Sequence, residues 1–274
     1  SPLGGTSIRY IQTLGRVVYF VPNAIAADFN TLDTTGYRSW PKLSDNDTDI
    51  DEGAFNLYRT GTYDFGWGKY NFSTHDVTGD SIYLIQLPNG QLKKFLVVNL
   101  DRDTAYNIRY CNIDNSDLQN VHIGKADYSG KSFVYLNLID KVVKDKEPLK
   151  TSWDLQFLRY AATDVTPGKI TPIIGVWLNK GDSAAERRNR NVAGNDYSGL
   201  TFSGKLNAIG WNWKHTGAYN ALLTGKNITE YLQFYVTDDS LAYFVKTAAG
   251  DVYKVVFTRY RLSNGRINFY TQKM

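Results

Sequence analysis

Histidines are the side chains best suited to ligate a metal ion or to move a proton at neutral pH. His75 lies in a polar, loop-like stretch, and His215 lies in a second one that begins after Trp213. A loop histidine beside aromatic residues is a candidate ligand for haem iron. The alternative is a hydrogen-bonded turn residue. Both histidines are therefore candidate ligands.

A basic cluster follows in the second half of the chain. Arg187, Arg188 and Arg190 crowd one short segment, and Tyr197 comes shortly after them. Arginine forks bind carboxylates, including the propionates of a porphyrin. The alternative is a solvated basic turn.

Aromatic side chains gather downstream of this cluster. Trp211, Trp213 and Tyr219 offer rings that can stack on a planar ligand or on a sugar. Tryptophan and tyrosine are also common core residues of β proteins, so packing inside the fold is the competing interpretation.

No enzymatic motif is present. The chain has no Gly-x-Ser-x-Gly elbow, no His-Glu-x-x-His, no phosphate loop and no dinucleotide fingerprint. Cys111, in a probable strand end, is expected to be buried and inert. We therefore predict a non-enzymatic protein, while a hydrolase with two carboxylates in a cleft stays open because spacing alone cannot reveal such a pair.

Four aspartates alternate at positions 45, 47, 49 and 51. A calcium-binding EF-hand loop needs glycine at its sixth position and glutamate at its twelfth, and Ile50 and Asn56 stand there. We predict a solvated acidic loop and no metal site.

Composition limits the function classes further. The 274 residues carry 31 Lys and Arg against 27 Asp and Glu, a net charge of +4 that is too small to indicate nucleic-acid binding. One cysteine excludes an intrachain disulfide, and no apolar run of about 18 residues predicts a transmembrane helix. The chain begins at Ser1 without a leader, which we interpret as a processed form.

The elements that must position these residues are mostly strands. Aromatic and β-branched runs predict strands at 82–100, 133–138, 231–236, 241–260 and 266–270. Turns at 88–90, 248–251 and 263–265 predict hairpins because each contains a glycine. The capping-box spacing from Ser183 to Glu186 predicts one short helix near 183–191.

The chain also contains an internal repeat. A shift of 160 residues places Tyr83 on Tyr243, Gly90 on Gly250 and Lys94 on Lys254, and each copy has a Gly-Trp pair upstream. We predict one all-β domain over 1–274 made of two related halves, roughly 66–123 and 210–270, that share one core.

Several strings together resemble the HmuY family, secreted or surface lipoproteins of Gram-negative bacteria that bind haem. The resemblance covers roughly residues 60–274, and its most specific parts are Trp-Asp-Leu-Gln-Phe-Leu-Arg-Tyr and Tyr-Phe-Val-Lys-Thr-Ala-Ala-Gly. The stretches that carry it are 135–138, 147–148, 152–160, 175–181, 209–211, 243–254 and 265–269.

The resemblance implies HmuY-like antiparallel sheets and a location at the outer-membrane surface or outside the cell. It also implies haem held by two axial His or Met side chains for iron acquisition. The stretches 153–164 and 182–200 contain neither residue, so ligands cannot be carried over by position. His215, His75, or a tyrosinate of Tyr160 or Tyr197 are the remaining candidates.

The leading hypothesis is a haem-acquisition protein whose partners are haem or a host haem protein and an outer-membrane receptor. The rival hypothesis is a surface module that binds a host protein or a glycan on the same scaffold without haem. It predicts an exposed cluster of Trp211, Trp213 and Tyr219 with no metal nearby.

Overall fold

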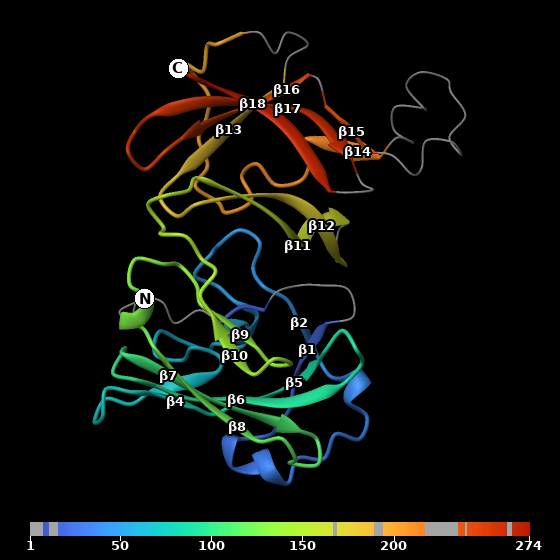
Figure 1. The fold of residues 1–274 in the computed structure, drawn as a ribbon, viewed down its shortest axis with the longest axis vertical. Coiled ribbons are helices and arrows are strands. Elements are labelled where there is room, and N and C mark those ends of the chain that lie inside the picture. The colour runs from blue at the N-terminus through green and yellow to red at the C-terminus, as the bar shows by residue number, and fades with distance from the viewer. Residues whose placement is uncertain are drawn as a thin grey trace. The chain divides into compact units, whose positions relative to one another are not determined.

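β-Strands make up nearly all of the regular structure, and the helices among the described residues are four short 3₁₀ turns. The expected all-β fold with antiparallel sheets is confirmed (Figure 1). The structure is a computed structural model that describes residues 8–10, 16–166, 169–188, 194–216, 235–238, 240–261 and 265–274.

The chain divides into two compact units. Unit 1 comprises Ser1–Ser152 and Tyr160–Pro172, and unit 2 comprises Trp153–Arg159 and Ile173–Met274. The single domain over 1–274 stays a prediction, because two units of one chain can unfold together or separately.

Unit 1 contains an eight-stranded sheet whose central strand is β6, flanked on one side by β5 and β4 and on the other by β7 and then β8. A two-stranded sheet of β9 and β10 accompanies it. The strands are β1 (Val17–Phe20), β2 (Lys42–Leu43), β3 (Gly68–Tyr70), β4 (Val77–Gly79), β5 (Ile82–Gln86), β6 (Leu92–Asp101), β7 (Ala105–Asn112), β8 (Gln119–Gly124), β9 (Tyr135–Asn137) and β10 (Val142–Lys144). The 3₁₀ turns are η1 (Ala26–Asn30), η2 (Tyr37–Ser39), η3 (Ala54–Asn56) and η4 (Ala126–Tyr128).

Unit 2 contains a four-stranded sheet in the order β13-β16-β17-β18 and a two-stranded sheet of β14 and β15. Its strands are β13 (Ser183–Arg188), β14 (Lys214–Thr216), β15 (Tyr235–Thr237), β16 (Leu241–Lys246), β17 (Val252–Arg261) and β18 (Arg266–Lys273). A hairpin of β11 (Leu155–Thr166) and β12 (Lys169–Leu178) contributes residues to both units. Positions 231–234 of the strand expected at 231–236 lie outside the described residues.

The short helix expected near 183–191 is wrong for the part that the structure describes, and residues 189–193 lie outside it. Residues Ser183–Arg188 form β13, in which Ala184 pairs with Val245 on one side and with Ser203 on the other. A helix cap is worth about 1 kcal/mol, whereas pairing with β16 along the whole of Ser183–Arg188 satisfies a row of backbone groups.

Glycines close the expected hairpins. Gly90 ends the β5–β6 turn with φ 82°, and Gly250 ends the β16–β17 turn with φ 94°. Both values lie in the left-handed region that glycine occupies without steric cost. Gly265 precedes β18 with φ 68°, and the rest of its expected turn lies outside the described residues.

The two hairpins have one pairing register. Leu84 lies opposite Lys94 in the first, and Phe244 lies opposite Lys254 in the second, 160 positions later. An equal register in both units is the relationship expected of a duplicated sheet.

A bulge repeats with the same spacing. The β6–β7 register shifts between Val97 and Asn99, and the β17–β18 register shifts between Phe257 and Arg259. Bulges are specific local features rather than chance irregularities, so their matched positions strengthen the correspondence of the two sheets.

The surrounding strands extend this correspondence. β1 pairs with β5 as β13 pairs with β16, and the β3–β4 pair has its counterpart in β14–β15. Residues 71–76 separate β3 from β4. Residues 217–234, which lie outside the described residues, separate β14 from β15, so the second copy has a longer stretch of chain between these two strands.

The hydrophobic cores are separate. Two clusters, one around Trp67 and Tyr83 and one around Phe29 and Ile82, draw only on residues of unit 1. A third cluster around Trp213 draws only on residues of unit 2. The single shared core that the repeat suggested is therefore absent from the described residues.

The acidic segment 45–52 is solvated only in part: Asp49 and Asp51 are exposed, as its composition predicted. Asp47 is buried, and its carboxylate accepts a hydrogen bond from the Thr163 backbone at 3.0 Å. The guanidinium of Arg9 donates at 2.5–3.1 Å to four backbone carbonyl oxygens, those of Asn46, Asp49, Ile50 and Glu52. The segment therefore wraps around the half-buried guanidinium of Arg9.

Candidate functional site

The predicted ligand His215 lies on β14, where it contacts a carboxylate. Its Nε2 is 3.1 Å from Asp238 Oδ2, and the same oxygen accepts a hydrogen bond from Arg188 at 3.0 Å. Burial alone would raise the pKa of Asp238, but hydrogen bonds from Ser240 and His215 keep it below its usual value. His215 therefore belongs to an ion-pair cluster with an ionised carboxylate.

The corresponding position in unit 1 has the same arrangement. Lys69 on β3 lies 3.6 Å from Asp80, as His215 on β14 lies beside Asp238. A basic side chain beside a carboxylate at the equivalent place in both units favours a structural role for His215.

The arginines of the basic cluster do not converge on one point. Arg187 and Arg188 are neighbours on β13 and so project from opposite faces of the sheet. Arg188 pairs with Glu186 and Asp238, whereas Arg187 donates to the backbone carbonyl of Asp196. Arg190 lies outside the described residues.

The two candidate tyrosines have different surroundings. Tyr160 is buried, and desolvation followed by the nearby Asp164 and Asp47 raises the pKa of its hydroxyl. A buried phenol that resists ionisation is a poor source of tyrosinate. Tyr197 is partly exposed, and its ring packs 5.5 Å from that of Phe244.

The expected tryptophan surface is not formed by Trp213. This side chain is 1% exposed and stacks on Phe257 with 4.4 Å between ring centroids, so the structure shows the core-packing alternative for it. Trp211 is half-buried, and Tyr219 lies outside the described residues. Cys111 is buried as expected, and burial raises the pKa of its thiol.

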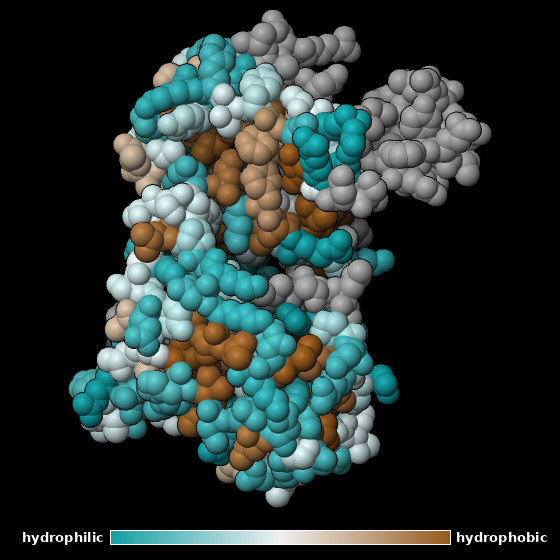
Figure 2. All heavy atoms as spheres, viewed as in Figure 1, coloured by the Kyte–Doolittle hydropathy of each residue, from teal (hydrophilic) through white to brown (hydrophobic). Residues whose placement is uncertain are grey.

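The structure instead exposes aromatic rings around the other candidate, His75. Tyr63 is 49% exposed and Phe72 is 63% exposed, and both rings contact the half-buried Tyr70. We call Tyr63, Tyr70, Phe72 and His75 the aromatic site. Figure 2 shows that hydrophobic residues interrupt the hydrophilic surface on the face in view.

The rings of the aromatic site lie at short distances from one another. Tyr63 and Tyr70 are stacked at 6.0 Å, and Phe72 meets them edge to face at 4.8 and 5.1 Å. The Tyr70 hydroxyl and His75 Nδ1 are 2.8 Å apart in a hydrogen bond. This bond leaves Nε2 of the exposed imidazole on the side away from Tyr70.

Local backbone structure builds the site. The amide of Tyr70 donates to the Tyr63 carbonyl at 2.9 Å, which places the two rings side by side across a tight hairpin. The chain then turns at Asn71, whose side chain accepts from the Ser73 amide at 2.8 Å. His75 has a φ of 64°, a conformation that non-glycine residues adopt rarely and often at functional positions.

The local density of aromatic residues is a sequence signal for this site, and motif searches based on residue spacing do not use it. Six aromatic residues fall between positions 58 and 72, more than the short strand β3 can bury. Phe65 and Trp67 enter the core and Tyr70 is half-buried, whereas the other three rings are exposed.

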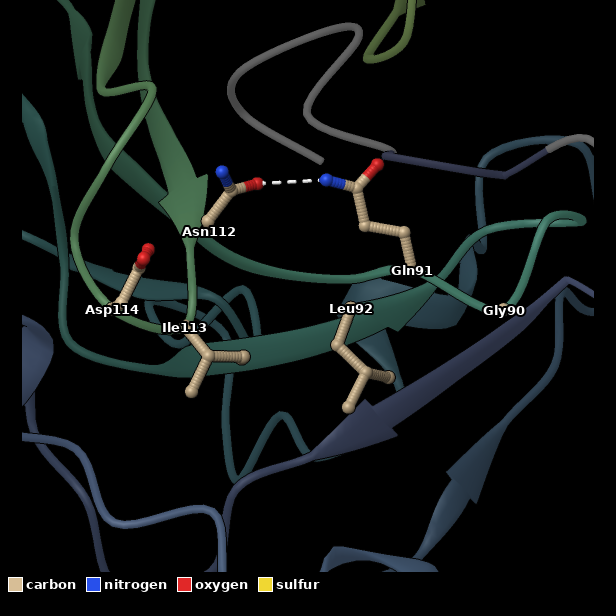
Figure 3. A pocket seen from close by; sticks show the side chains of 6 residues that line it. All are labelled: Gly90, Gln91, Leu92, Asn112, Ile113 and Asp114. Carbon is tan, nitrogen blue, oxygen red and sulfur yellow. Dashed lines mark hydrogen bonds between the residues drawn. The ribbon is translucent and has the colours of Figure 1, made fainter.

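A shallow depression of about 470 Å³ lies elsewhere in unit 1 (Figure 3). It is lined by Gly90, Gln91, Leu92, Asn112, Ile113 and Asp114. The Gln91 side chain donates a hydrogen bond to Asn112 Oδ1 at 3.0 Å. None of the site residues predicted from the sequence lines this depression.

The described residues contain no group of three or more His, Cys, Asp or Glu side chains placed to hold a metal ion. Nor do they contain a helix of the length and apolarity that crossing a membrane requires.

Comparisons with protein-family models, with curated proteins and with solved structures found no match to this chain.

Proposed function

We propose that this chain is a non-enzymatic binding protein and that its aromatic site stacks against the sugar rings of a glycan. One observation supports the proposal most strongly: Tyr63 and Phe72 leave about half or more of their surface exposed while packing against each other. Exposed apolar clusters of this kind mark binding surfaces in soluble proteins.

The chemistry of the site suits a carbohydrate. The C–H faces of a pyranose pack on aromatic rings, and polar groups at the margin bind its hydroxyls. The exposed imidazole of His75, which is hydrogen-bonded to Tyr70, provides such a group.

A soluble oligosaccharide array followed by calorimetric titration of the sugars that bind tests the proposal. We expect Phe72→Ala and Tyr63→Ala each to weaken binding at least about tenfold, equivalent to about 1.4 kcal/mol. The matched control is Tyr270→Ala, which removes an exposed aromatic ring of unit 2. Failure of every sugar to bind, or equal affinity in Phe72→Ala and wild type, would overturn the proposal.

Haem binding is a second candidate, and His75 is the residue that favours it. The resemblance to the HmuY family implies haem, which would supply an iron centre and a flat apolar ring. In the tautomer in which His75 Nδ1–H donates to the Tyr70 hydroxyl oxygen, Nε2 keeps a lone pair for iron, as in histidines held by outer-sphere partners at metal sites. The aromatic rings beside it would pack on the porphyrin face. His215 fits less well because its Nε2 contacts Asp238.

Titration with hemin separates the two candidates. A shifted Soret band that is lost in His75→Ala and kept in His215→Ala would support haem at the aromatic site. A shift lost only in His215→Ala would contradict this placement, and no shift at micromolar protein would remove the candidate. Glycan binding by contrast should tolerate His75→Ala better than Phe72→Ala.

Export to the cell surface is part of the same proposal, since the resemblance implies it. Proteolysis of intact cells that produce the protein tests it, because a surface protein is digested while cytoplasmic markers survive.

A further inference from the structure

The duplicated sheets differ at one edge. In unit 1, β7 pairs with β6 on one side and with β8 on the other. Its counterpart in unit 2 is β18, which pairs with β17 and with no other strand in the part of the chain that the structure describes. In Figure 1, β18 is the last strand of the chain and is drawn in red.

The correspondence between β7 and β18 is residue by residue. Ile108 lies opposite Val97, and Phe269 lies opposite Phe257, at the same place beside the repeated bulge. The covering strand β8 in unit 1 therefore shows which positions of β18 a further strand would meet.

Equivalent core-side residues of β7 and β18 differ in exposure, as expected if only β7 is covered by a further strand. Ile108 is 7% exposed and Tyr110 is fully buried, because β8 and the β9–β10 hairpin pack against the same cluster. Phe269, the counterpart of Ile108, is 40% exposed, although its ring contacts Phe157 and Phe257. An apolar residue that faces the core side of the sheet thus remains uncovered in unit 2.

We propose that the outer edge of β18 is a docking surface for an extended segment of another polypeptide, which adds to the sheet as an antiparallel strand. An open strand edge presents a row of backbone donors and acceptors that such a segment satisfies, and side-chain pockets set its sequence.

The equivalent strand β8 indicates the chemistry of this segment. Val121 lies opposite Ile108, and Ile123 lies opposite Tyr106, both on the core side. His122 and Asn120 alternate with them and are exposed. The segment that pairs with β18 should therefore have an apolar side chain opposite Phe269, and apolar and polar side chains should alternate along it.

Charge favours a partner over a second copy of this chain. The sequence of β18 contains Arg266 and Lys273 and no acidic residue, and Lys273 forms an ion pair with Asp251 at 2.9 Å. Arg259 and Arg261 are exposed on the neighbouring strand. Two copies of β18 side by side would bring basic ends together, which is unfavourable across a strand pair. A segment with acidic side chains at its polar positions is complementary.

A labelled synthetic peptide of residues 114–125 is the probe, because it contains β8 and two aspartates. Fluorescence anisotropy with the full chain measures its affinity. Phe269→Lys should weaken binding at least about tenfold, whereas Phe269→Leu and the matched control Tyr270→Lys should retain it. A peptide with Val121→Asp and Ile123→Asp should not bind.

Hydrogen exchange locates the bound peptide. The amides of β18 should exchange more slowly in its presence. Slowed exchange at β7 instead, equal binding by Phe269→Lys and wild type, or no binding of the peptide would each overturn the proposal. Sedimentation showing a dimer that Phe269→Lys dissolves would identify a second copy as occupant and also overturn it. Glycan and hemin binding are measured separately and do not depend on this edge.

Discussion

Lys94 and Lys254 occupy the same position in the two units, and each is buried in the second strand of its hairpin. Lys94 Nζ donates to the Phe29 carbonyl at 2.8 Å, and Lys254 Nζ donates to the Gly194 carbonyl at 3.1 Å. Phe29 lies in the segment that follows β1, and Gly194 lies in the segment that follows the equivalent strand β13. In each unit, the buried lysine therefore holds this segment against the sheet through a hydrogen bond.

Replacing either lysine by methionine should destabilise its unit. Lys94→Met and Lys254→Met keep the length of the side chain but leave a buried carbonyl without its donor, which costs about 1–3 kcal/mol. Denaturant unfolding measures the loss. The exposed Lys246→Met should change stability by less than about 0.5 kcal/mol, and an equally small effect of Lys94→Met would contradict the prediction.

The two buried tryptophans test whether the units unfold separately. Trp67→Ala and Trp213→Ala each remove a fully buried ring and should cost about 3–5 kcal/mol. If the units are independent, Trp67→Ala destabilises β6 alone and Trp213→Ala destabilises β17 alone, as read by hydrogen exchange in denaturant. An equal response of both strands to either variant would instead support the single domain predicted from the sequence.

Lys214 should make the stability of unit 2 depend on pH. Burial lowers its pKa to about 7, and its Nζ lies 4.4 Å from the centroid of the Trp213 ring. An unfolded lysine has a pKa of about 10.4, so between pH 7 and 10 the unfolded chain holds a proton that the folded chain has released. The free energy of unfolding therefore rises with pH in this window and has no slope from Lys214 below it.

The substitution Lys214→Met should remove this rise. Denaturant midpoints between pH 7 and 9.5 measure it, below the range in which tyrosines ionise. Lys246→Met should retain the wild-type slope. Parallel curves for wild type and Lys214→Met would show that Lys214 is not the titrating group.

Arg9 should control the order of the acidic segment 45–52. Its Nη1 donates to three backbone carbonyls and its Nη2 to a fourth, so a planar fork is required. Arg9→Met should speed amide exchange and increase proteolysis within 45–52. Arg9→Lys should show the same losses, because an ammonium group cannot replace the fork. Full protection in Arg9→Lys would contradict a role for the fork.

Some features of this protein follow from short-range sequence. Gly90 and Gly250 end their hairpins where expected, because a turn needs a backbone conformation that glycine adopts without steric cost. The burial of Cys111 also follows from its strand context. Alternation and turn chemistry act within a few residues, so one sequence suffices to predict them.

Other features depend on which segments meet in space. The capping box at Ser183 favours a helix locally, yet pairing of Ala184 on both sides makes the segment a strand. Trp213 and Phe72 are equally aromatic in the sequence, and only the packing around them buries one and exposes the other. Whether an apolar side chain is core or binding surface is decided by its neighbours across the sheet, because burial is a property of the assembled layer and not of the residue.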